Sequence, residues 1–188
     1  NFARDSQFSF NPPLEAMPKE PDINPAKYEP SFNIVLHQPE IPPNTGAIGR
    51  TCVALQAKLW LVRPLGFQVD EKTLRRAGLD YWQHLEWEVV DDWAALQQAA
   101  TQRNAGPDRM WMFSRFSKRD YRDPGYRRGD WLIFGSETCG LPPSLLKEPA
   151  QNLRIPTFEK VRSLNLASAA AVAGYEVARQ VSLFPPNS

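Results

Sequence analysis

The sequence predicts an α/β fold, with a mostly parallel sheet and helices on both of its faces. Short runs that are apolar at every position recur along the chain, for example at residues 110–113 (MWMF) and 131–134 (WLIF). Strands that are apolar on both sides are typical of parallel sheets with both faces covered. Longer segments with helical spacing alternate with these runs, which favours β-α-β units.

The first half of the pattern begins abruptly at Phe32. Its predicted elements are, in order, a strand at residues 32–37, a helix at 45–55, a strand at 58–62 and one or two short helices within 70–85. Asn44 is the expected N-cap of the first helix, because its side chain can accept a hydrogen bond from a free amide. Pro64 ends the second strand, and Gly78 interrupts the helical segment.

The second half repeats the alternation. Its predicted elements are a strand at residues 87–90, a helix at 91–102, strands at 110–113, 131–134 and 153–155, and a terminal helix at 164–183. An acidic cap precedes the helix at 91–102, and Gly106 with Pro107 ends that region. The terminal helix is rich in Ala and Val and lacks proline, so it can pack closely on another helix of this chain or of a partner.

The domain organisation follows from composition. Residues 1–31 hold six of the 18 prolines and five acidic against three basic residues, without periodicity, and are expected to be a disordered extension or tag remnant. Residues 32–184 are predicted to form one domain, because no linker interrupts them, and residues 185–188 a tail.

Composition excludes several classes of protein. The 188 residues include 22 Lys and Arg against 21 Asp and Glu, so no global basic excess indicates nucleic acid. Cys52 and Cys139 are too few for a disulfide framework or a zinc site. The apolar runs fall far short of the ~20 residues of a membrane helix. We therefore expect a cytoplasmic protein that neither associates with a membrane nor binds a metal ion.

Familiar catalytic motifs are missing. The sequence has no GxxxxGK[ST] phosphate loop, no GxGxxG dinucleotide turn and no GxSxG nucleophile elbow. His37 and His84 lie 47 residues apart without a cluster of other ligands, which favours structural roles over metal binding.

Three polar loops remain at the ends of predicted strands, where open α/β sheets bind their ligands. The first, at residues 39–50, contains Asn44 and Arg50, which by themselves are more typical of a helix cap and a solvated helix residue than of a functional site. The second, at residues 134–142, places Gly135 directly after a strand. Glu137 in this loop is an acid, a ligand anchor or a structural acceptor for backbone amides, and its position alone does not choose.

The third loop, at residues 154–169, leads into the terminal helix. It contains Arg154, Lys160 and Arg162 against Glu159, followed by Ser163 and Asn165 at the opening of the helix. A simple N-cap role accounts for Ser163 without any further function.

In this order the three loops resemble the three motifs of the SPOUT superfamily of RNA methyltransferases, in its SpoU branch of 2'-O-methyltransferases. The matching segments are IPPNTG with Arg50, GSETCGLP and IPTFEKVRSLNLASA, over a resemblance that spans residues 32 to about 183. RRAGLDYW, at residues 75–82, is similar to a segment of single-domain enzymes that methylate the pyrimidine at the wobble position of tRNA. Ala47 and Gly49 depart from the bulkier residues usual in the first motif.

The resemblance implies a fold and a site that the residues alone do not. It implies a C-terminal trefoil knot, homodimers with sites at the interface, and S-adenosylmethionine as cofactor. Matching positions assign cofactor binding to Phe113, Gly135, Ile155 and Ser163. They assign catalysis to Arg50, acting as a base or by electrostatic stabilisation, with Asn44, Glu137, Ser163 and Asn165 orienting it or the ribose.

A local basic segment supplies the expected RNA contacts. Residues 103–128 hold eight basic against three acidic residues, a composition equally typical of a solvated loop. Beside the motifs it predicts that Arg115, Lys118 and Arg119, with Arg162 of the third loop, bind tRNA. The alternatives are methylation of another tRNA or rRNA position, a non-catalytic RNA-binding protein, and an enzyme acting on a small nucleotide.

Overall fold

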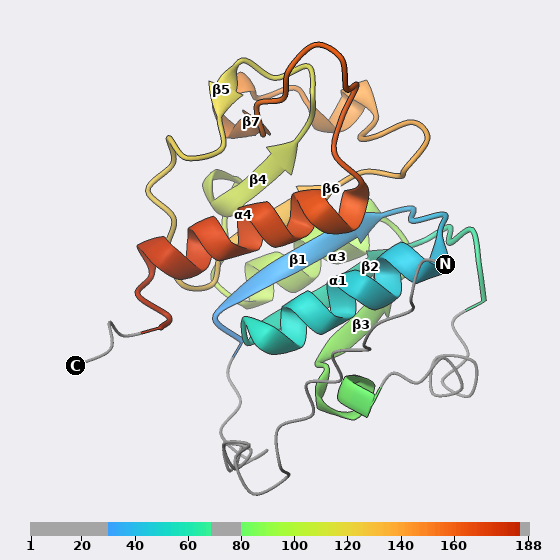
Figure 1. Cartoon of the computed structure of the whole chain (residues 1–188). Coiled ribbons are helices and arrows are strands. Elements are labelled where there is room, and N and C mark those ends of the chain that lie inside the picture. Colours follow the sequence, from blue (N-terminus) through green and yellow to red (C-terminus); the bar gives the residue numbers. More distant parts are fainter. Residues whose placement is uncertain (1–29, 69–79, 185–188) are drawn as a thin grey trace, which may run out of the picture.

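In the computed structural model, which describes residues 30–68 and 80–184, a seven-stranded sheet crosses the molecule (Figure 1). The strands are β1 (Phe32–His37), β2 (Ala57–Val62), β3 (Trp87–Val90), β4 (Met110–Phe113), β5 (Arg119–Asp120), β6 (Trp131–Phe134) and β7 (Asn152–Arg154). Their order is β3-β2-β1-β6-β4-β7-β5, and every neighbouring pair is parallel. The predicted α/β class and parallel sheet are confirmed.

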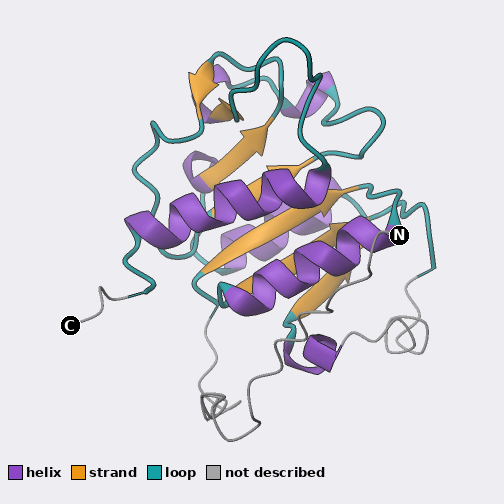
Figure 2. Ribbon diagram, in the orientation of Figure 1, coloured by secondary structure: helices purple, strands orange, loops and turns teal. Residues whose placement is uncertain are grey.

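Helices cover both faces of the sheet (Figure 2). They are α1 (Pro42–Ala54), α3 (Trp93–Gln102) and α4 (Leu166–Gln180). One core cluster joins α1 and α4 to one face, and a second joins α3 to the other. A Cβ on Gly174 would lie 2.8 Å from Leu55 Cδ1, so the small residues of α4 serve its close packing on α1 of the same chain.

The central strands explain the apolar runs of the sequence. All residues of β1, β2, β4 and β6 are buried. The two-residue β5 was not predicted, because a pair of charged residues carries no strand signal. Residues 69–79, which hold most of the predicted helical segment, lie outside the described residues, and Asp80–His84 forms a short 3₁₀ turn.

Two predicted caps are corrected. The N-cap of α1 is Ile41 rather than Asn44, because Pro42 and Pro43 have the backbone angle that starts a helix earlier. The N-cap of α4 is Asn165 rather than Ser163, and its side chain accepts from the amides of Ala167 and Ser168. Neither residue is a cap: Asn44 lies in the first turn of α1, and Ser163 lies in the loop before α4.

Ser31 belongs to the packed structure. Its amide donates to the Gln56 carbonyl at 2.7 Å, and its carbonyl accepts from the Gly129 amide at 2.8 Å. The rest of the predicted extension, apart from Pro30, and the predicted tail lie outside the described residues. No helix in the described ranges is long and apolar enough to cross a membrane.

The loop after β6 folds back against its own start. A Cβ on Gly135 would lie 2.0 Å from the Gly140 carbonyl carbon and 2.2 Å from the Leu141 amide nitrogen. Gly140 has a φ of +72°, which favours glycine, and its amide donates to the Ser136 carbonyl. Both glycines are therefore needed by the backbone itself. The trefoil knot stays a prediction.

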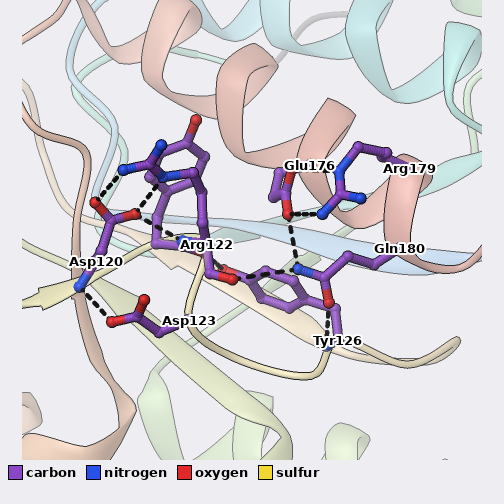
Figure 3. A network of polar contacts seen from close by, with 8 residues as sticks. Asp120, Arg122, Asp123, Tyr126, Glu176, Arg179 and Gln180 are labelled. Atoms are coloured by element: carbon purple, nitrogen blue, oxygen red, sulfur yellow. Dashed lines mark hydrogen bonds and ion pairs between the residues drawn. The ribbon is translucent and has the colours of Figure 1, made fainter.

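A polar network ties the segment after β5 to the end of α4 (Figure 3). The Tyr126 amide donates to Gln180 Oε1 at 2.9 Å, and Gln180 Nε2 donates to Glu176 Oε1 at 2.7 Å. Arg179 donates two hydrogen bonds to Glu176 and, with Gln180, holds the pKa of that carboxyl below its usual value despite partial burial.

We expect Gly135→Ala to destabilise the fold by at least ~2 kcal/mol, because the new methyl group would overlap backbone atoms that cannot rotate away. Urea unfolding measures the effect. Gly125→Ala is the matched control, since a Cβ there meets nothing within 4 Å, and it should stay within about 0.5 kcal/mol of the parent. Equal stability of the two variants would contradict the close approach of Gly135 to the backbone of Gly140 and Leu141.

We expect Glu176→Gln to cost about 1 kcal/mol at pH 7. Because the folded-state pKa of Glu176 is lowered, its contribution is present above the unfolded value of about 4.3 and is lost as the pH falls through the folded value. Urea unfolding between pH 7 and pH 3.5 should therefore show a difference in the free energy of unfolding between the parent and Glu176→Gln that shrinks only below about pH 4. Glu148→Gln, at an exposed carboxylate, is the control, and a pH-independent difference would contradict the pairing.

Candidate functional site

A cavity of about 700 Å³ opens at the carboxyl ends of the strands. The loops after β4, β6 and β7 line it, together with the starts of α1 and α4. Its volume is within the range of small-molecule sites. Phe113, Gly135, Ile155 and Ser163, the four residues predicted to bind a cofactor, all line this cavity.

The wall of the cavity combines an apolar surface with free backbone groups. Phe113 stacks on Phe134 with ring centroids 4.6 Å apart, and Leu153 continues this apolar surface. The amide and carbonyl groups of Gly135 and Ile155 make no hydrogen bond within the described chain. Such a wall suits a ligand with a flat apolar ring system and polar edges.

Glu137 fastens the loop after β6 to the start of α1. Its carboxylate accepts from the Glu40 amide at 2.8 Å, from the Ile41 amide at 3.3 Å and from Asn44 Nδ2 at 3.0 Å. A carboxylate at a helix N-terminus also interacts favourably with the helix dipole. Of the three roles open in the sequence, this geometry supports the structural acceptor.

Two further contacts extend this clamp. Glu40 Oε2 accepts from the Thr138 amide at 3.1 Å and from the Thr138 hydroxyl at 2.6 Å. Asn165 Nδ2 donates to Asn44 Oδ1 at 3.0 Å. The structure therefore joins Glu137, Asn44 and Asn165 in one chain of hydrogen bonds that crosses all three predicted motifs. Glu40 and Thr138 were not predicted, because loop residues far apart in sequence carry no mutual signal.

Arg50 stands apart from these residues. It does not line the cavity, and its position six residues after Asn44 places it about 9 Å farther along α1 and on another side of the helix. Its guanidinium carbon lies 4.6 Å from the centroid of the Tyr81 ring. Within one chain, the structure does not bring Arg50 to the other predicted catalytic residues.

The basic segment at residues 103–128 is divided between two edges of the sheet. Its ends precede β4 and β6 and so lie at the edge opposite the cavity, whereas Arg115 and Lys118 follow β4. Arg115 and Arg162 line the cavity, as does the exposed Arg154, which was not assigned a role. These cations and Lys118 have no side-chain hydrogen bond or ion pair to any described residue.

Arg119 differs from the other predicted RNA contacts. Its guanidinium donates to the Ala150 carbonyl and lies 5.5 Å from the centroid of the Trp111 ring. The side chain is half-buried and already engaged by the protein. Its part in RNA binding stays a prediction.

His37, His84 and Cys52 do not line the cavity. Burial lowers the pKa of His37, whose ring meets Trp93 edge-on at 6.2 Å, and His84 is exposed. Burial raises the pKa of the Cys52 thiol. The described ranges contain no group of three or more His, Cys, Asp or Glu that could hold a metal ion.

Three comparisons with known proteins bear on this site. The tRNA (cytidine(34)-2'-O)-methyltransferase of Burkholderia pseudomallei is 42% identical over 151 residues, which are 79% of this chain and 95% of that protein. A structure described as giving insights into the 2-OH methylation of C/U34 on tRNA has 42% identity and a TM-score of 0.73, covering 81% of this chain and 97% of that one. An AdoMet-bound rRNA methyltransferase from Sinorhizobium meliloti has 26% identity and a TM-score of 0.65, covering 79% and 56%.

The sequence model of one family spans most of the chain. It matches residues 31–175, a range that holds the three motifs, the cavity and Arg50. Since this match covers well over half of the chain and the Burkholderia pseudomallei relative matches over 95% of its length, the chain belongs to the SpoU rRNA Methylase family.

Proposed function

We propose that this protein transfers the methyl group of S-adenosylmethionine to the 2'-hydroxyl of the pyrimidine at position 34 of tRNA, the first anticodon nucleotide. The observation that carries the proposal is the convergence of all three motif loops on one cavity, joined by the Glu137, Asn44 and Asn165 hydrogen bonds. The names of the relatives favour position 34 over other positions.

The cavity fits the cofactor by its volume and by its mixture of groups. The unpaired backbone groups of Gly135 and Ile155 suit the polar edges of an adenine ring, and Phe113 and Leu153 suit its faces. When bound, S-adenosylmethionine supplies an electrophilic methyl group on a sulfonium centre. Ser163 at the cavity wall is available to bind it, because Asn165 rather than Ser163 caps α4.

The protein must then assist loss of the hydroxyl proton. Glu137 holds the start of α1, and we propose that Asn44, Ser163 and Asn165 orient the ribose, while Arg50 stabilises the negative charge that develops on the oxygen. Arg50 does not line the cavity of its own chain. We therefore propose a homodimer in which Arg50 of one copy reaches the ribose bound in the cavity of the other copy. The exposed apolar side chains of Phe158, Val161 and Tyr175 support such an interface.

The RNA is proposed to bind across the free cations at the mouth of the cavity. Arg115, Arg154 and Arg162 line the cavity, and Lys118 follows Arg115 on the same loop. An anticodon loop presents unpaired nucleotides, which proteins can contact individually, whereas bases in an RNA duplex are hidden. This arrangement favours a loop over a helix as substrate.

One experiment tests the proposed function. The protein is incubated with labelled S-adenosylmethionine and separate pools of tRNA and rRNA, and the labelled nucleotide is then mapped. Label at O2' of nucleotide 34 supports the proposal. Label elsewhere in tRNA or in rRNA assigns another position, and RNA binding without label indicates a non-catalytic RNA-binding protein.

We expect Arg50→Ala to lower turnover at least ~100-fold, the scale of losing one charge-stabilising group, while leaving affinity for S-adenosylhomocysteine nearly unchanged. The two effects separate because Arg50 does not line the cavity. Single-turnover methylation and calorimetry measure them. Arg63→Ala, at another exposed arginine, is the control, and normal turnover of Arg50→Ala would refute this assignment.

We expect simultaneous replacement of Arg115, Lys118 and Arg162 by Ala to flatten the salt dependence of RNA binding by about two to three units of log–log slope, because each phosphate contact releases counterions. The control variant replaces Arg103, Arg127 and Arg179 by Ala. It loses the same number of positive charges, but at the opposite edge of the sheet. Equal slopes of RNA affinity against salt concentration for the two triple variants would contradict the proposed RNA-binding surface.

A further inference from the structure

We infer that Tyr81 is a positioning residue, which holds the guanidinium of Arg50 in its working orientation. The inference rests on the proposed function, because it requires that Arg50 act on the ribose. Two contacts of Tyr81 carry it. The ring lies 4.6 Å from the Arg50 guanidinium carbon, and the hydroxyl donates to the Gly46 carbonyl at 2.8 Å.

The turn that carries Tyr81 is seated firmly on α1. A Cβ on Gly49 would lie 2.8 Å from Trp82 Cζ3 and 3.0 Å from Leu85 Cδ2, so both side chains use the space that glycine leaves. Trp82 and Leu85 are only 6% and 7% exposed. Gly49 is one of the two residues that depart from the first motif, and the contact with Trp82 gives its departure a structural reason.

The seated ring acts on a long, exposed side chain. A free arginine samples many rotamers, and ordering it at the moment of reaction costs conformational entropy. An aromatic face attracts the guanidinium and restricts it beforehand. Held in this way, Arg50 acts as a fixed cation that stabilises the alkoxide. The hydroxyl proton then passes to solvent, as the O–CH3 bond forms and the S–CH3 bond breaks.

The test compares two substitutions at Tyr81. Tyr81→Leu removes the ring and should lower kcat by about 3- to 30-fold, the range of cation–π energies, with KM for RNA and affinity for S-adenosylhomocysteine unchanged. Tyr81→Phe keeps the ring and should remain within about twofold of the parent. Gln83→Leu, at an exposed position of the same turn, is the control.

A double-mutant cycle separates positioning from a general structural effect. In the Arg50→Ala background, Tyr81→Leu should cause no further loss of kcat, because its effect passes through Arg50. NMR relaxation of the Arg50 Nε signal should show an ordered side chain in the parent and a mobile one in Tyr81→Leu.

Equal losses in both backgrounds, or a loss in Tyr81→Phe as large as in Tyr81→Leu, would overturn the inference. The proposed function fails separately, when the parent itself labels no RNA.

Discussion

The contact on which the site depends is the acceptance of three hydrogen bonds by the Glu137 carboxylate. It joins the loop after β6 to the first turn of α1. In the reverse direction, the Glu40 carboxylate accepts hydrogen bonds from the amide and hydroxyl of Thr138 in the loop after β6. Two carboxylates that each accept amide protons from the opposite loop hold the loops in one relative position. These hydrogen bonds fix the first turn of α1 against the loop after β6, while core packing sets the direction of the helix.

The sheet order explains why these loops meet at all. The chain builds β1, β2 and β3 outward in one direction and later places β6, β4, β7 and β5 on the other side of β1. The helix after β1, α1, and the helix between β3 and β4, α3, cover opposite faces of the sheet, and the cavity lies at the carboxyl ends of β4, β6 and β7. All residues of β1 and β6 are buried in the sheet, so the polar loops that follow these strands start from positions set by the core.

The cations of the described chain differ in whether the protein itself pairs them. Arg109, at the opposite edge, is paired with the buried Asp130, which also accepts from Trp111 Nε1. Arg122 is held by Asp120. Cations near the cavity lack such partners among the described residues, which leaves them available to an anionic ligand. A balanced total charge thus conceals a basic rim.

Local patterns along the chain predict the α/β class, four of the central strands almost to the residue, and the three loops that line the cavity. These features depend on local signals: apolar runs, prolines and turn glycines. The resemblance of the loops to a known family added the cofactor residues, and all four lie in one cavity. Both levels use residues that are adjacent in sequence.

The contacts of the individual loop residues emerge from the folded chain. Asn44 is a predicted cap that instead links Glu137 to Asn165, 121 residues away from Asn44. Glycine at position 135 is required by the backbone of Gly140, and Arg50 is held by a ring from another element. The partner of a side chain is set by the packing of segments that are distant in sequence. The residues next to that side chain in the sequence carry no signal for this packing.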